Sequence, residues 1–306
     1  MNIDFIIRKV NNFAHELGDF VQQNNLAYYG LVGVGLLVTF KAYSSYSYSR
    51  KRKVWDSAGK DVVVIHQFNR GKLAPSLSPF PVKLETFCRM ARIKYKVDYD
   101  DPLGPKGKCP WITFNGKDLA DSQFCIEYLR KKFVVDLNKH LTKEERAIAH
   151  SFRILVEEHL YWPMAYWRWS LDDTNSLFTV WNSPFIVKLI KPFIGRSVKQ
   201  AAYAQGIGRH NAQEIYQIAI EDLRALSNFI GSKKFLMGDV PCEEDCAVFG
   251  MLVQIVWNLP GSPFEAVMNR ELKNLKEYVH RITKELWPDW QEVITSQKTD
   301  FTELRL

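Results

Sequence analysis

The chain has 306 residues, of which 46% are hydrophobic and 25% are charged. These values are typical of a globular protein of roughly two domains, and they exclude a disordered, collagen-like or polytopic membrane chain. The net charge is +7, but residues 1–53 carry most of the excess, so the remainder is close to neutral and we expect no nucleic-acid partner. The five cysteines form no CxxC pair, which argues against a disulfide framework and against a zinc ribbon.

The N-terminal segment, residues 1–53, has the features of a membrane anchor. Residues 26–40 are uncharged and almost entirely apolar, tyrosines flank the run on both sides, and the basic cluster 50–53 follows. We therefore expect a single transmembrane helix over about 26–46 that contacts membrane lipid. The positive-inside rule then places residues 50–306 in the cytoplasm. The alternative is a buried or peripheral helix, because three glycines weaken the apolar run.

Residues 54–135 show the alternation of a small α/β domain. Short β-branched or alternating runs predict strands at 61–68, 93–99, 111–114 and 117–120. Apolar residues at helical spacing predict helices over 82–91 and from 121 or 122 to 133. Asn115-Gly116 predicts a tight hairpin between the last two strands. A βαβ unit followed by a hairpin and a closing helix is the thioredoxin-like order.

Residues 136–306 are predicted to be entirely helical. Thr142 and Glu145 form a capping box that opens a helix reaching about residue 170, and a second capping motif ends at Asp245. The run 157–159, Glu-Glu-His, has no further His or Cys at ligand spacing, so we expect no metal site.

Three local motifs give the chain a resemblance to a known superfamily. Ser78-Pro79-Phe80, Lys108-Cys109-Pro110-Trp111 and Asp121-Ser122 follow one another in the order and spacing typical of glutathione S-transferases. With the segment 205–210 and the helix after Asp245, the chain resembles the failed axon connections family, relatives of the metaxins, over about residues 55–295. The resemblance implies an α+β, glutathione S-transferase-like fold, with a thioredoxin-like domain over 54–135 and an all-α domain over 136–306.

The resemblance also implies a site for glutathione as substrate. Ser78 would be the catalytic residue, because a hydroxyl at a helix start can donate to a thiolate and so lower its pKa. The tripeptide would be held by Ser76, Pro79, Phe80, Lys108, Cys109, Pro110, Asp121 and Ser122, with a cis peptide before Pro110. An aromatic wall for the electrophile would come from Tyr161, Trp162, Tyr166 and Trp167.

Each of these residues also has a structural interpretation. Ser78 and Asp121 are good helix caps whether or not chemistry occurs, Cys109 is expected to serve packing, and the aromatic residues fit a core. Gln67 and Phe68 stand where tyrosine-type transferases have their catalytic phenol.

Two functions therefore remain open. The first is a membrane-anchored glutathione S-transferase that conjugates electrophiles in detoxification and takes part in axon development. The second is a non-catalytic, metaxin-like adaptor that uses the same fold for protein contacts. Whether the chain forms a homodimer also stays open.

Overall fold

The computed structural model describes residues 16, 18, 25–174 and 176–296. The chain divides into two compact units, Met1–Ser57 and Ala58–Leu306, and each is described by itself. The predicted stretch before the membrane anchor and residues 297–306 of the predicted helical domain lie outside the described residues, apart from residues 16 and 18.

The first unit contains one long helix, α2 (Asn25–Asp56). Among the described residues, no helix combines the length and the apolar character that crossing a membrane requires. This corrects the predicted transmembrane helix over about 26–46 and removes the basis for lipid contact there. With 32 residues, α2 is long enough to cross a bilayer, so it is its composition that does not fit a membrane span. The apolar run 26–40 is short, and Lys41 and four serines follow it in the second half of α2. The cytoplasmic placement of residues 50–306 stays a prediction.

The second unit begins with a four-stranded sheet in the order β2-β1-β3-β4. Its strands are β1 (Val63–His66), β2 (Tyr95–Asp98), β3 (Trp111–Phe114) and β4 (Lys117–Ala120). β1 pairs in parallel with β2 and antiparallel with β3, and β3 pairs antiparallel with β4. The predicted hairpin is confirmed, since Asn115 and Gly116 both have positive φ. This is the predicted thioredoxin-like order.

Two helices cover one face of this sheet. Side chains of α3 (Pro79–Met90) and α4 (Ser122–Phe133) share a core with inward residues of β1 and β3. Between β2 and β3, the fully described segment 99–110 forms no helix. It lies against Trp111 instead, at Gly104, where an added Cβ would meet the indole ring at 2.4 Å.

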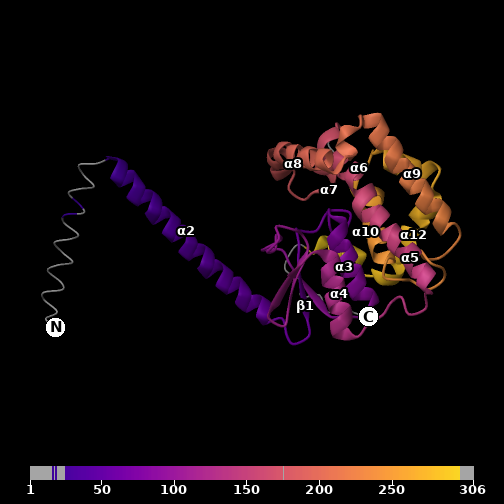
Figure 1. Ribbon diagram of the computed structural model, residues 1–306, viewed down its shortest axis with the longest axis horizontal. Coiled ribbons are helices and arrows are strands. Elements are labelled where there is room, and N and C mark those ends of the chain that lie inside the picture. Colours follow the sequence, from indigo (N-terminus) through magenta and orange to yellow (C-terminus); the bar gives the residue numbers. More distant parts are fainter. Residues whose placement is uncertain (1–15, 17, 19–24, 175, 297–306) are drawn as a thin grey trace. The chain divides into compact units, whose positions relative to one another are not determined.

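Helices make up the remainder of the unit (Figure 1). They are α5 (Lys143–Ile154), η1 (Leu155–Leu160), α6 (Tyr161–Tyr166), η2 (Trp167–Leu171), α7 (Ser176–Val180), α8 (Pro184–Gln205), η3 (Ile207–Arg209), α9 (Ala212–Ile230), α10 (Asp245–Asn258), α11 (Pro263–Arg270), α12 (Lys273–Leu286) and α13 (Trp290–Thr295). The predicted single helix from Lys143 to about 170 is one continuous rod, α5 to η2, but η1 and η2 are π-helical.

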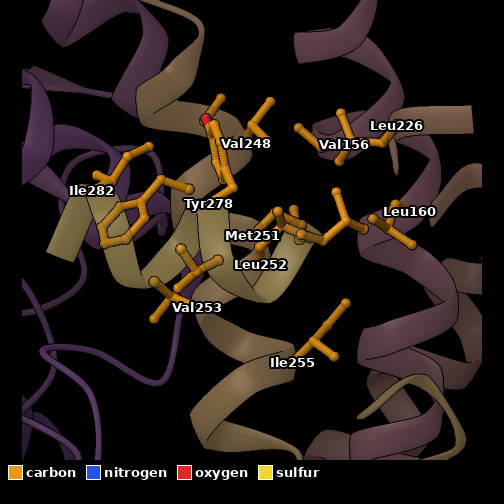
Figure 2. Packing of buried hydrophobic residues seen from close by; sticks show 14 of the residues in the cluster. Val156, Leu160, Leu226, Val248, Met251, Leu252, Val253, Ile255, Tyr278 and Ile282 are labelled. Atoms are coloured by element: carbon orange, nitrogen blue, oxygen red, sulfur yellow. The ribbon is translucent and has the colours of Figure 1, made fainter. Parts of the chain in front are cut away.

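Helix α10 is the centre of the helical core. Figure 2 shows its residues Met251, Leu252 and Ile255 among side chains from the neighbouring helices. The Asp245 carboxylate accepts hydrogen bonds from the Cys242 N–H at 2.8 Å and from the Tyr278 hydroxyl at 2.6 Å. The predicted capping motif is thereby confirmed.

Helix α10 also packs on α3, which joins the sheet domain to the helical one. At Gly250, an added Cβ would lie 2.6 Å from the carbonyl oxygen of Pro79 and 3.1 Å from the backbone nitrogen of Lys83. The missing side chain therefore lets the start of α3 sit directly on α10. At the other end of α3, Arg89 makes a bidentate ion pair with Asp289.

Candidate functional site

A cleft of about 480 Å³ lies beside the N-terminal ends of α3 and α4, with η1 and α6 as its opposite wall. It is lined by Phe68, Ser78, Phe80, Leu103, Lys108, Cys109, Asp121, Ser122, Gln123, Arg153, Glu157, Glu158, Tyr161 and Trp162. Residues from all three sequence motifs and from the aromatic helix therefore meet in one place, although 84 positions separate Ser78 from Trp162.

Ser78 is the N-cap residue of α3, directly before Pro79. Its backbone is extended, and its side chain makes no hydrogen bond to the helix that it begins. The hydroxyl is thus not consumed by capping. Ser78 lines the cleft at the start of α3, where Pro79 and Pro81 carry no N–H, so Phe80 supplies the first backbone donor of this helix.

Hydrogen bonds from the helical domain fix the loop before Ser78. The Asn258 side-chain amide donates to the Ser76 carbonyl at 2.9 Å, and Arg168 donates to the Leu77 carbonyl at 2.6 Å. The Ser76 hydroxyl accepts the Ser78 N–H at 3.2 Å. Ser76 is buried and does not line the cleft, so it positions Ser78 from behind.

Asp121 and Ser122 form the second corner of the cleft. Asp121 has φ of 86° and caps α4, accepting the Gln123 N–H at 3.1 Å. Its other carboxylate oxygen accepts a hydrogen bond from Lys108 at 3.2 Å. Partial burial by itself raises the pKa of Asp121. The hydrogen bond and charge of Lys108, together with the backbone donors, outweigh it and hold that pKa below its ordinary value. The carboxylate is therefore ionised at neutral pH.

The third corner is the Cys109-Pro110 peptide, which is cis as predicted. Pro110 is buried and does not line the cleft, whereas Cys109 does. Burial raises the pKa of the Cys109 thiol to about 12, against the smaller opposing effect of a backbone hydrogen bond with Phe68. The thiol is protonated at neutral pH, which supports packing rather than redox chemistry.

Of the predicted aromatic wall, only part reaches the cleft. Tyr161 and Trp162 line it, and the ring centroids of Phe80 and Tyr161 are 5.2 Å apart. Tyr166 and Trp167 lie about one turn further along the rod and are buried elsewhere, Trp167 against Phe264. Pro79 is also buried, under Gly250, and lies outside the cleft.

Gln123 and Arg153 line the cleft but were missed as site residues by sequence reasoning. Gln123 follows the Asp121-Ser122 pair directly, and Arg153 stands four positions before Glu157, to which it donates at 2.9 Å. The buried Lys83 donates to both Glu157 and Gln123. An i, i+4 Arg–Glu pair on the helix before the aromatic residues was the available signal.

Comparisons with known proteins agree with this geometry. The glutathione S-transferase N-terminal domain family matches residues 79–175, and the glutathione S-transferase C-terminal domain family matches residues 219–282. The fold is shared with a solved beta-etherase from Sphingobium sp., with a TM-score of 0.54 and 16% identity over 74% of this chain and 99% of that one. It is also shared with a glutathione S-transferase of Ceriporiopsis subvermispora solved in complex with glutathione, with a TM-score of 0.53 and 14% identity over 73% and 97% of the two chains. The fold is thus that of the glutathione S-transferases.

Three relatives show where the chain belongs among proteins with the glutathione S-transferase fold. The chain is 32% identical to Failed axon connections of Drosophila melanogaster over 77% of its own length, but it spans only 60% of that relative. It is 30% identical to Metaxin-1 of Macaca fascicularis, over 74% of this chain and 75% of the other. It is 29% identical to the isoprene-epoxide–glutathione S-transferase of a Rhodococcus species, over 69% and 93%. The chain belongs to the metaxin-related, glutathione S-transferase-like family that includes Failed axon connections.

Proposed function

We propose that the chain binds glutathione in the cleft and conjugates it to an electrophile, with Ser78 stabilising the thiolate. The observation that carries the proposal is that Ser78, the Asp121-Ser122 corner and Cys109 line one cavity. The backbone of Cys109 would pair with the extended tripeptide. Tyr161 and Trp162 would contact the electrophile.

The cleft has charged groups of both signs. Glutathione has two carboxylates and one ammonium group, and the lining presents Lys108 and Asp121 together with Arg153, Glu157 and Glu158. Arg153 is already paired with Glu157, so Lys108 is the cation that would meet a carboxylate of the ligand. In the structure, Lys108 occupies the free oxygen of Asp121. On binding, the ligand ammonium would take that place and Lys108 would turn to a carboxylate of the ligand, so Asp121 and Lys108 would each keep a partner of opposite charge.

The test compares the full-length chain with Ser78→Ala. Glutathione affinity, measured by calorimetry, should stay within a few-fold, because the other corners hold the tripeptide. The rate of conjugation at neutral pH should fall by about 10- to 100-fold, the scale of one lost hydrogen bond to an anion. The loss should shrink at alkaline pH, where the free thiol ionises without help.

The matched control is Ser183→Ala. Ser183 also precedes a proline at a helix start and also makes no side-chain capping bond, but it lies at α8, outside the cleft. Its replacement should leave the rate unchanged. Equal rates for wild type and Ser78→Ala at every pH would disprove the assignment of Ser78.

A second candidate is a non-catalytic, metaxin-like adaptor that uses the fold for protein contacts. One observation favours it: the Asp121 carboxylate already has Lys108 and the first N–H groups of α4 as partners without any ligand. Absence of glutathione binding by the wild-type chain would favour this function. A role in axon connections, taken from the name of the Drosophila relative, belongs equally to both candidates.

A further inference from the structure

Helix α8 is exposed along most of its length. Of its 22 residues, only Val187, Gly195 and Ala202 are buried. In Figure 1 it runs along the outer edge of the helical part of the second unit. One face of α8, which includes Ile190 and Ile194, packs on the neighbouring helices, and the rest of its surface is exposed.

The exposed face of α8 is unusually apolar. Phe185, Leu189 and Phe193 follow one another at i, i+4 spacing, and their side chains are 73%, 57% and 78% exposed. Ile186 lies beside them and is also exposed. Residues at this spacing form one ridge on a helix surface, so the apolar side chains are contiguous rather than scattered.

A cationic stripe runs next to this ridge. Lys188, Arg196 and Lys199 are exposed; at helical spacing Lys188 and Lys199 fall on one side of the apolar ridge, and Arg196 lies one turn beyond Phe193 in line with it. Among the described residues, none of the three lies within ion-pair distance of an acidic group. The sequence contains no Asp or Glu between Asp173 and Glu214. The positive charge of this surface is therefore not neutralised locally.

A shallow hollow of about 920 Å³ adjoins the stripe. Trp169, Phe178 and Pro192 line it together with the cationic side chains of α8. Gly195 brings α8 close to the preceding rod, because an added Cβ would lie 2.6 Å from the Trp169 carbonyl oxygen. The hollow thus offers aromatic surface beside amines and a guanidinium, which suits a molecule with an anionic head and an apolar tail.

We propose that α8 docks on an anionic phospholipid surface. Phe185, Leu189 and Phe193 would enter the boundary between headgroups and acyl chains, while Lys188, Arg196 and Lys199 would pair with lipid phosphates. A basic stripe beside an apolar ridge, with no acidic residue, is the arrangement of helices that lie in the membrane interface. None of these residues belongs to the segment 26–46 or to the lining of the cleft.

The charge and the apolar ridge together favour a lipid surface over a second copy of the chain or an acidic protein. A second copy of the chain would set one basic stripe near another, which costs free energy unless an anion intervenes. An acidic protein surface would pair with the basic side chains. It would not bury the exposed aromatic side chains of the ridge, which need an apolar partner. An anionic bilayer supplies both phosphates and hydrocarbon.

The experiment is vesicle flotation of the full-length chain, with vesicles of phosphatidylcholine alone or with a quarter of phosphatidylserine. The wild-type chain should bind the mixed vesicles and bind the neutral vesicles far less. Its binding to the mixed vesicles should weaken with added salt. Replacing Lys188 and Lys199 by Gln should lower partitioning about 30-fold, from roughly 1 kcal/mol per basic residue near an anionic surface. Replacing Phe185 and Phe193 by Ser should weaken binding at least about 10-fold without removing its salt dependence.

The control variant replaces the four basic residues 50–53 by Gln, since that cluster could also attract anionic lipid. Circular dichroism and urea unfolding establish that each variant folds. Binding that survives both α8 variants and disappears with the 50–53 variant would overturn the proposal. So would failure of the wild-type chain to bind mixed vesicles, or α8 variants that change only the oligomeric state or the capture of an acidic protein.

Discussion

Gly250→Ala tests whether the contact between α10 and α3 positions the cleft. The new Cβ would stand 2.6 Å from the Pro79 carbonyl oxygen and 3.1 Å from the Lys83 nitrogen. Both are backbone atoms, so no side chain can swing away, and α3 must shift by several tenths of an ångström. Overpacking of this kind costs about 1–3 kcal/mol, and the better helix propensity of alanine returns about 1 kcal/mol. We expect a net loss of up to about 2 kcal/mol in the free energy of unfolding.

The same shift should also disturb Ser78, which directly precedes Pro79. A misplacement approaching 1 Å can cost roughly 100-fold in rate, so conjugation should fall more than stability alone explains. Urea unfolding followed by tryptophan fluorescence gives the stability, and initial rates in the folded range give the activity. Gly35→Ala is the control, because nothing lies within 4 Å of the added Cβ. A Gly250→Ala chain as stable and as active as wild type would refute the reasoning.

Two further predictions concern titratable groups of the cleft. With its pKa raised to about 12 from an ordinary 9.0, Cys109 should react slowly with iodoacetamide in the native chain at mildly alkaline pH. Its contribution to stability is full below pH 9.0 and is lost as the pH rises toward 12; fast native labelling would contradict this. Lys108→Met should raise the pKa of Asp121 toward its ordinary value, so that glutathione binding is lost at a higher pH on acidification. Binding titrations across the acidic range, wild type beside variant, would show an unchanged acid limb if Lys108 does not act on Asp121.

Local patterns predicted the sheet domain well, because each element there carries its own signal. The hairpin at Asn115-Gly116 needs positive φ at two successive positions, and strands β3 and β4 have the predicted bounds. Helix α3 begins three residues before the predicted position 82, since its start is set by Pro79 at N1 rather than by apolar spacing.

The failures have physical causes that a local pattern does not contain. The π-helical turns η1 and η2 change the number of residues per turn, and one further turn carries Tyr166 and Trp167 away from the cleft. The anchoring of the Ser78 loop by Arg168 and Asn258 depends on residues ninety or more positions away. At residues 26–46 the flanking tyrosines and the basic cluster are those of a membrane span, but the helix that carries them is not apolar enough to be one.

Sequence leaves open whether Ser78 is a helix cap or a functional hydroxyl, and a comparison with Ser262 tests the first of these roles. Ser78 and Ser262 both precede a proline at N1 of a helix, yet only the Ser262 hydroxyl accepts a capping bond, from the Glu265 N–H at 3.1 Å. Ser262→Ala should therefore cost about 1 kcal/mol of stability, whereas Ser78→Ala should cost almost none. Urea unfolding of the two variants measures both values. If Ser78→Ala loses as much stability as Ser262→Ala, the hydroxyl serves the helix in solution, and the thiolate loses its proposed donor.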